Sequence, residues 1–130
     1  MSVGRNSFFR MIGTFESVIL DCPDPKVLAK FYSELLGGEI VGFDDDWAEL
    51  LLPNDRPLLA FQHVENYTPP AWPGQDVPQQ SHIDVKVEDF DVAEADVLAL
   101  GAKKTGSDHE TFRVYLDPAG HPFCLITPSD

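Results

Sequence analysis

Hydrophobic and polar positions recur with two different periods along the chain, and these periods predict where strands and helices lie. Residues 15–21 alternate between apolar and polar side chains, which is typical of a half-buried strand. Asp24 and Pro25 then provide an N-cap and a proline at the first helical position, and apolar residues recur at helical spacing until Gly37 and Gly38. Three further strands are predicted, at residues 39–43, 47–52 and 58–64. The first half therefore reads strand, helix, strand, strand, strand.

The second half has the same order of elements. The pattern predicts strands at residues 82–87, 102–105, 112–116 and 123–127, and a helix that opens near Asp89 and ends at Leu100 and Gly101. Sliding the sequence by 65 residues aligns the two halves without a gap, so that Asp24 meets Asp89 and Trp47 meets Phe112. Agreement in element order, capping position and apolar pattern predicts an internal duplication.

The length of 130 residues fits one domain built from these two units. We expect an N-terminal extension at residues 1–12 and a single domain at residues 13–130. Within that domain, module 1 covers about 13–65, a proline-rich linker covers 66–80, and module 2 covers about 81–128. The linker contains four of the eleven prolines, together with Tyr67 and Trp72, and is expected to be stiff.

Charge and cysteine content limit the classes of partner and the cellular compartment that we expect. Nine basic and 22 acidic residues give a net charge of −13, which argues against nucleic acid and against an anionic membrane surface as partners. No apolar run of membrane-spanning length and no secretory signal are found. Only Cys22 and Cys124 are present, far apart in the sequence, so we expect a cytoplasmic protein with reduced thiols. Phosphate-binding glycine loops, GxSxG and HExxH motifs are also missing.

Three sequence motifs carry a resemblance to a known family. They are Val18-Ile-Leu-Asp-Cys-Pro-Asp-Pro25, Phe31-Tyr-Ser-Glu-Leu-Leu-Gly-Gly38 and Asp117-Pro-Ala-Gly-His-Pro-Phe123. On these motifs and the duplicated unit, the chain resembles the vicinal oxygen chelate superfamily, and within it the glyoxalase-like and bleomycin-resistance-like branch. The resemblance implies an α+β fold in which tandem βαβββ modules form an open, curled mixed-sheet barrel, with outer helices and a ligand cavity inside. It also implies a homodimer.

The resemblance places the metal-ligand positions of the superfamily on the first and last strand of each module. These positions correspond to Ser17, Leu59, His82 and Cys124 in this sequence. Catalytic divalent ions in the superfamily take His, Glu or Gln ligands, and only His82 is of this kind. We therefore predict no metal cofactor, although an unconventional site that uses His82, His63 and water remains an alternative.

The candidate pocket residues come from strands of both modules. His82, Asp84 and Lys86 share the strand face predicted to line the cavity, and His82 is the best candidate for a catalytic residue. An equally simple interpretation is a histidine held by a polar neighbour. The other candidates also have simpler interpretations, in which they do not bind a ligand. Cys124 is then a small buried packing residue, His63 an exposed residue at a strand end, and the aromatic side chains part of the core. The predicted substrate-binding set is Ser17, Trp47, Phe61, His63, His82 and Cys124.

These observations lead to three functional hypotheses. The first is a glyoxalase-like protein that binds a small molecule in a pocket between the two modules, without a catalytic metal. The second is a metal-dependent lyase, isomerase or dioxygenase of the same superfamily. The third is a resistance protein that sequesters a drug in a homodimer. The fold alone does not make the chain an enzyme, because function depends on the site.

Overall fold

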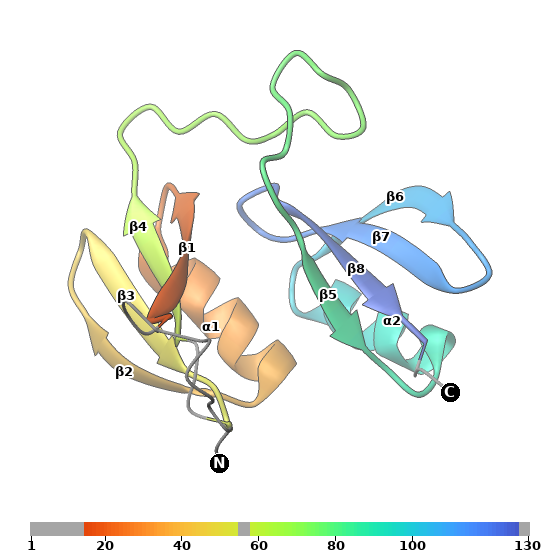
Figure 1. Ribbon diagram of the computed structural model, residues 1–130, viewed down its shortest axis with the longest axis horizontal. Coiled ribbons are helices and arrows are strands. Elements are labelled where there is room, and N and C mark those ends of the chain that lie inside the picture. The colour runs from red at the N-terminus through yellow and green to blue at the C-terminus, as the bar shows by residue number, and fades with distance from the viewer. Residues whose placement is uncertain (1–14, 55–57, 128–130) are drawn as a thin grey trace, which may run out of the picture.

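Two four-stranded sheets, each with one helix, make up the protein in a computed structural model that describes residues 15–54 and 58–127 (Figure 1). The predicted N-terminal extension at residues 1–12 lies outside the described residues. The first module contains β1 (Ser17–Cys22), α1 (Pro25–Leu36), β2 (Glu39–Phe43), β3 (Trp47–Leu51) and β4 (Leu58–His63). The second contains β5 (Ile83–Lys86), α2 (Phe90–Ala99), β6 (Lys103–Asp108), β7 (Phe112–Leu116) and β8 (Pro122–Ile126).

Both sheets have the same mixed topology. The first has the strand order β1-β4-β3-β2 and the second has the order β5-β8-β7-β6. In each sheet the first and last strands of the module pair in parallel, and the other pairs are antiparallel. The fold is therefore α+β with two modules and two unclosed sheets, as the sequence predicts.

Helix α1 begins and ends where the sequence places its signals. The Asp24 side chain accepts hydrogen bonds from the backbone N–H groups of Lys26 and Val27, and Pro25 occupies the first turn, where it has no N–H to satisfy. At the other end, Gly37 has a φ of 77°, a left-handed conformation that favours glycine, and its N–H donates to the carbonyl of Ser33. These caps fix the helix over Pro25–Leu36.

Strand pairing shows that the 65-residue correspondence between the two modules fails by one residue in their last strands. Val18 pairs with Leu59 in the first module, whereas Ile83 pairs with Phe123 in the second. The offset between modules is thus 65 residues in the first strand and 64 in the last, because the β3–β4 connection is one residue longer than the β7–β8 connection. The gap-free alignment is therefore wrong from β4 onward, and a shift of one residue exchanges the two faces of a strand.

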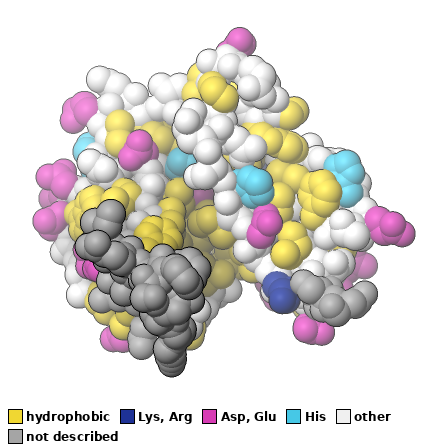
Figure 2. All heavy atoms as spheres, viewed as in Figure 1, with side chains coloured by type: hydrophobic (Ala, Val, Ile, Leu, Met, Phe, Trp, Pro, Cys, Tyr) yellow, Lys and Arg dark blue, Asp and Glu magenta, His cyan; other side chains and the backbone are white. Residues whose placement is uncertain are grey.

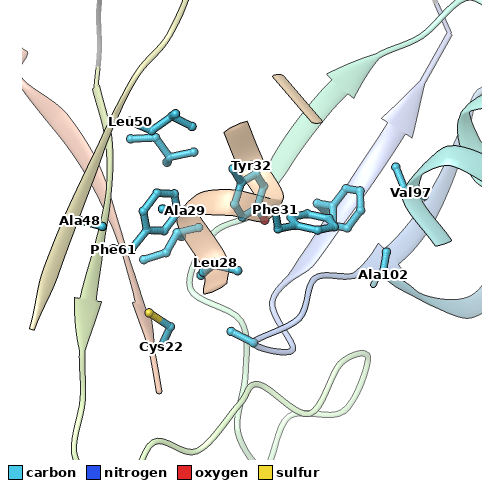
Figure 3. Packing of buried hydrophobic residues seen from close by; sticks show 14 of the residues in the cluster. Cys22, Leu28, Ala29, Phe31, Tyr32, Ala48, Leu50, Phe61, Val97 and Ala102 are labelled. Carbon is cyan, nitrogen blue, oxygen red and sulfur yellow. The ribbon is translucent and has the colours of Figure 1, made fainter. Parts of the chain in front are cut away.

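The hydrophobic core joins the two modules through α1 (Figure 3). Tyr32 stacks on Phe61 of β4 with ring centroids 5.7 Å apart, and Phe31 contacts Phe123 of β8 edge-on at 5.8 Å. Figure 3 shows these α1 side chains between Phe61 on one side and Val97 and Ala102 on the other. Helix α1 therefore packs on its own sheet and also contacts the second module.

Helix α2 contributes the buried Val97 to the core and also makes polar contacts with its sheet. Glu94 accepts a hydrogen bond of 2.6 Å from the Tyr115 hydroxyl, and Arg113 and Lys104 lie within 3.4 Å of the same carboxylate. The hydrogen bond from Tyr115 and these cations lower the pKa of Glu94, against the opposing effect of burial. Arg113 also lies over the Phe90 ring. Neither described helix is long and apolar enough to cross a membrane.

Candidate functional site

A cavity of about 520 Å³ lies on the face of the second sheet that is turned away from α2. Its floor comes from alternate residues of β5, β7 and β8, and the linker supplies part of its wall. Figure 2 shows this face, where apolar side chains over the second sheet surround histidine and acidic side chains. The lining residues are Trp72, Gln79, His82, Asp84, Thr111, Phe112, Val114, Pro122, Cys124, Ile126 and Thr127.

Three side chains with metal-ligating or acid-base chemistry meet in this cavity. The Nε2 atom of His82 lies 3.2 Å from Oδ1 of Asp84, and Asp84 pairs across the strands with Cys124. One ligand atom from each of the three residues lies within 4.8 Å of the others. His82 and Asp84 are exposed at the cavity, whereas Cys124 is buried on its floor. The arrangement holds an acceptor carboxylate beside an imidazole and a thiol.

The Cys124 thiol stays protonated near neutral pH. Burial, the negative charge of Asp84 and a hydrogen bond to that carboxylate raise the pKa of Cys124 to about 11. A thiol nucleophile needs the opposite shift, because the thiolate is the reactive form. Burial and the neighbouring Asp84 therefore favour Cys124 as a neutral wall residue over a nucleophile.

The structure brings together two of the six predicted pocket residues, His82 and Cys124. Ser17 and Trp47 lie on the open face of the first sheet, where the Trp47 indole N–H donates to the Glu49 carboxylate at 3.0 Å. No residue of the first module that the structure describes lines the 520 Å³ cavity. The 520 Å³ cavity thus belongs to the second module and the linker, whereas the sequence prediction placed the pocket between the modules.

Three predictions about β4 need correction. Phe61 is fully buried against Tyr32 on the α1 face, so it does not line a cavity on the other face. His63 has the same parity in the strand, and its Nδ1 lies 2.9 Å from the carbonyl oxygen of Pro23. The position equivalent to Cys124 is Ala60, and Leu59 faces the core. All three errors come from the extra residue in the β3–β4 connection.

Several residues of the cavity wall have no clear signal in the sequence. Thr111 and Phe112 follow the β6–β7 turn, and Phe112 has the strand parity of Val114 and faces the cavity. Gln79 gave no signal, because the linker has no periodicity from which to predict an inward direction. Asp84 was predicted to share the cavity face with His82, and the structure places it in the cavity wall, although it was not included in the predicted binding set.

The residues present do not fit the divalent ion used by metal-dependent members of the superfamily. Of the four expected positions, Ala60 has no donor, and Ser17 lies on the other sheet. The remaining donors are His82 and Cys124, with Asp84 beside them, and a thiol with a raised pKa must lose its proton before it can bind an ion. A nitrogen, oxygen and sulfur set would suit Zn²⁺ better than Mg²⁺.

Comparison with known proteins supports the family assignment. The family model for a glyoxalase-like domain matches residues 17–126, which includes every helix and strand of the structure. No curated protein matches the chain.

Solved structures share the fold at low sequence identity. A possible glyoxalase from Bacillus cereus is 13% identical, with 89% of this chain and 99% of that chain covered and a TM-score of 0.66. The fosfomycin resistance protein FosX from Mesorhizobium loti is 17% identical, with 92% and 94% covered and a TM-score of 0.67. A glyoxalase/bleomycin resistance protein/dioxygenase family enzyme from Burkholderia phytofirmans PsJN is 14% identical, with 88% and 98% covered and a TM-score of 0.68. The chain belongs to the glyoxalase-like domain family.

Proposed function

We propose that the protein binds a small, mostly apolar molecule in the cavity of the second module and needs no catalytic metal to do so. The observation that carries this proposal is the cavity of about 520 Å³, whose size is within the range of small-molecule sites. Its wall combines the aromatic residues Trp72 and Phe112 with a small number of polar groups, a composition typical of such sites.

A neutral fluorescent probe tests the proposal. We expect N-phenyl-1-naphthylamine to bind with a stoichiometry of one per chain and to gain fluorescence as it enters the apolar cavity. Cys124 is buried on the cavity floor, so bound probe is expected to slow its alkylation by iodoacetamide at least tenfold. The labelling is measured by mass spectrometry in a Cys22→Ala background, in which Cys124 is the only cysteine left.

Two tryptophan variants provide the matched comparison. Ile126 is partly buried and lines the cavity, so Ile126→Trp should fill the space and abolish saturable binding. Val92 is exposed on α2, and Val92→Trp should leave the affinity within twofold of the wild type. Equal binding by the wild type and Ile126→Trp would show that the probe occupies another surface and would contradict the proposal.

A metal-dependent reaction that uses Zn²⁺ is the second candidate, because one ligand atom from each of His82, Asp84 and Cys124 lies within 4.8 Å of the others. The metal content of protein purified without added ions separates the two functions. A stoichiometric ion that is lost in His82→Ala would overturn the metal-free proposal. An ion bound by these residues must also raise the stability of the native state, so its removal should lower the melting temperature. Protein without bound metal that still binds the probe supports the metal-free function.

We also propose that the protein is a homodimer. Apolar side chains at both edges of the first sheet are exposed on this chain, among them Ile19 on β1 and Val41 and Phe43 on β2. Exposed apolar surface of this kind is typical of association sites. Light scattering on purified protein is expected to give a mass of about twice 14.5 kDa, and a monomer mass at micromolar concentration would remove the dimer from the proposal.

A further inference from the structure

Among residues 15–54 and 58–127, those that line the cavity include one carboxylate and no lysine or arginine. Asp84 supplies the carboxylate, and its side chain is half exposed at the cavity. Besides His82, the other lining residues have neutral side chains. A carboxylate accepts hydrogen bonds and cannot donate them while it is ionised, so it favours a ligand that brings N–H or O–H donors.

The groups around Asp84 leave much of its charge available. His82 lies 3.2 Å away and Cys124 pairs with Asp84 across the strands, and neither is a lysine or arginine that would pair permanently with the carboxylate. Lys86 is the next residue on the same face of β5, but it does not line the cavity. A ligand cation in the cavity would contact Asp84, whereas a ligand anion could approach Lys86 outside it. The sign of the ligand charge is therefore testable at two neighbouring positions.

Gln79 provides a second acceptor that has no partner. Its Oε1 atom is buried and accepts no hydrogen bond from any residue that the structure describes. A buried polar atom without a partner destabilises the folded state. Gln79 lines the large cavity and also a neighbouring one of about 200 Å³, so rotation of its side chain can turn the amide oxygen toward either space. A donor on a bound ligand would satisfy this oxygen.

Two aromatic side chains lie in the same cavity wall as these acceptors. Trp72 from the linker and Phe112 from β7 both line the cavity that contains Asp84. The faces of aromatic rings attract cations, tryptophan most strongly, and also pack well against apolar ligand bodies. The site therefore joins two acceptors with two aromatic rings.

On the strength of the proposed binding function, we propose that the cavity selects a compact organic cation, an aliphatic or aromatic body that ends in a protonated amine. Its ammonium group donates to the Asp84 carboxylate and to the Gln79 amide oxygen, while its body packs against Trp72 and Phe112. Asp84 and Gln79 are then the residues that determine specificity.

Three probes of similar size and different charge test the sign of the ligand. They are 4-phenylbutylamine, 4-phenylbutan-1-ol and 4-phenylbutyrate, and their affinities are measured by isothermal titration calorimetry at pH 7. We expect the amine to bind at least tenfold more tightly than the carboxylate, with the alcohol between them. The preference should shrink as salt is added, because Asp84 is partly exposed.

Substitutions identify the groups responsible. Asp84→Asn should weaken the amine at least fivefold and leave the alcohol within twofold of its original affinity. Gln79→Met removes the unpartnered oxygen at similar volume, so it should weaken the amine about threefold while the melting temperature stays the same or rises. Lys86→Met should leave amine binding unchanged or strengthen it. Asp76→Asn makes the same change of charge at an exposed linker residue outside the cavity and serves as the control.

The outcomes separate this inference from the function on which it rests. Tighter binding of 4-phenylbutyrate, or its loss in Lys86→Met, would overturn the cation assignment. Equal affinity for all three probes would do the same, while binding of N-phenyl-1-naphthylamine would still support a small-molecule site. Failure of the amine to bind would also overturn the inference, whatever the naphthylamine result. An amine preference that survives Asp84→Asn would show that the cation binds elsewhere.

Discussion

Replacing Phe123 by alanine is expected to lower the free energy of unfolding by about 4 kcal/mol, the usual cost of deleting a buried aromatic ring. Phe123 is fully buried on β8, where it contacts Phe31 of α1 and stacks near Tyr115 of β7. Its ring thus joins the helix of the first module to the sheet of the second. In a domain of this length the same change corresponds to a fall of roughly 15 °C in melting temperature, measured by calorimetry and by urea unfolding.

Two other variants show whether position and shape cause the effect. Phe123→Leu keeps an apolar side chain and should cost less than half as much, because it leaves a smaller void. Val92→Ala removes an exposed methyl pair and should stay within about 0.5 kcal/mol of the wild type. If Phe123→Ala produced two separate transitions, with the first module melting as in the wild type, the shared core would not be a single cooperative unit.

Local signals explain why the sequence predicted the elements well. Asp24 with Pro25 and Gly37 act within one turn of the helix that they limit, so α1 was predictable to the residue. Asp89 caps α2 in the same way, by accepting from the backbone N–H of Val92. Strand β6 was harder, because Lys103–Asp108 is mostly polar and includes Gly106 at a φ of 84°. The prediction of residues 102–105 therefore ended before the irregular part of the strand.

The candidate site was less predictable, because it depends on register and on a segment without periodicity. Because of one extra residue between β3 and β4, the metal-ligand position of the superfamily falls on Ala60 and not on Leu59. The same shift directs the Phe61 side chain toward the core. The apolar residues of β4 are compatible with either face, so their pattern does not reveal the shift. Gln79 reaches the cavity only because the linker folds over the second sheet, a long-range contact that no local pattern encodes.

The linker has a fixed path for a physical reason. Gly120 lies in the β7–β8 turn at a φ of 92°, and a Cβ added there would lie 2.7 Å from the Cβ of Pro69. The close approach requires glycine at the turn and holds the linker against the second module. The Tyr67 hydroxyl contacts the residue after this turn glycine, because it lies 3.2 Å from Nε2 of His121. The segment that supplies Trp72 and Gln79 to the cavity is thus packed against the fold near its beginning.

Replacing Asp117 by alanine is expected to lower the free energy of unfolding by about 3 kcal/mol, because it leaves three donors without their acceptor. Asp117 is only 2% exposed, and its Oδ1 accepts from the backbone N–H groups of Ala119 and His121 at 2.9 Å. Its Oδ2 accepts from the Tyr32 hydroxyl at 2.7 Å. The carboxylate therefore shapes the β7–β8 turn of the second module and fastens it to α1 of the first.

Conservative substitutions separate these two roles in urea unfolding. Asp117→Asn keeps a carbonyl oxygen for the turn and should cost about 1 kcal/mol, whereas Tyr32→Phe removes only the bond between modules. The double variant Tyr32→Phe with Asp117→Asn should lose less stability than the sum of the losses in the two single variants. The reason is that both substitutions remove the same hydrogen bond. Fully additive losses would contradict a direct interaction between the two side chains.

The pH dependence of stability tests which effect dominates at Asp117. Burial raises the pKa of this carboxyl group, against the hydrogen bonds from Tyr32 and the turn and the charge of His121, which lower it. The folded state then holds the Asp117 proton more tightly than the unfolded chain does. This contribution to stability is fully present below the pKa of an unfolded aspartate, about 3.9, and is lost as the pH rises through the raised pKa. The wild type should therefore lose its advantage over Asp117→Asn as the pH rises, and an advantage that grows with pH would show that the hydrogen bonds outweigh burial.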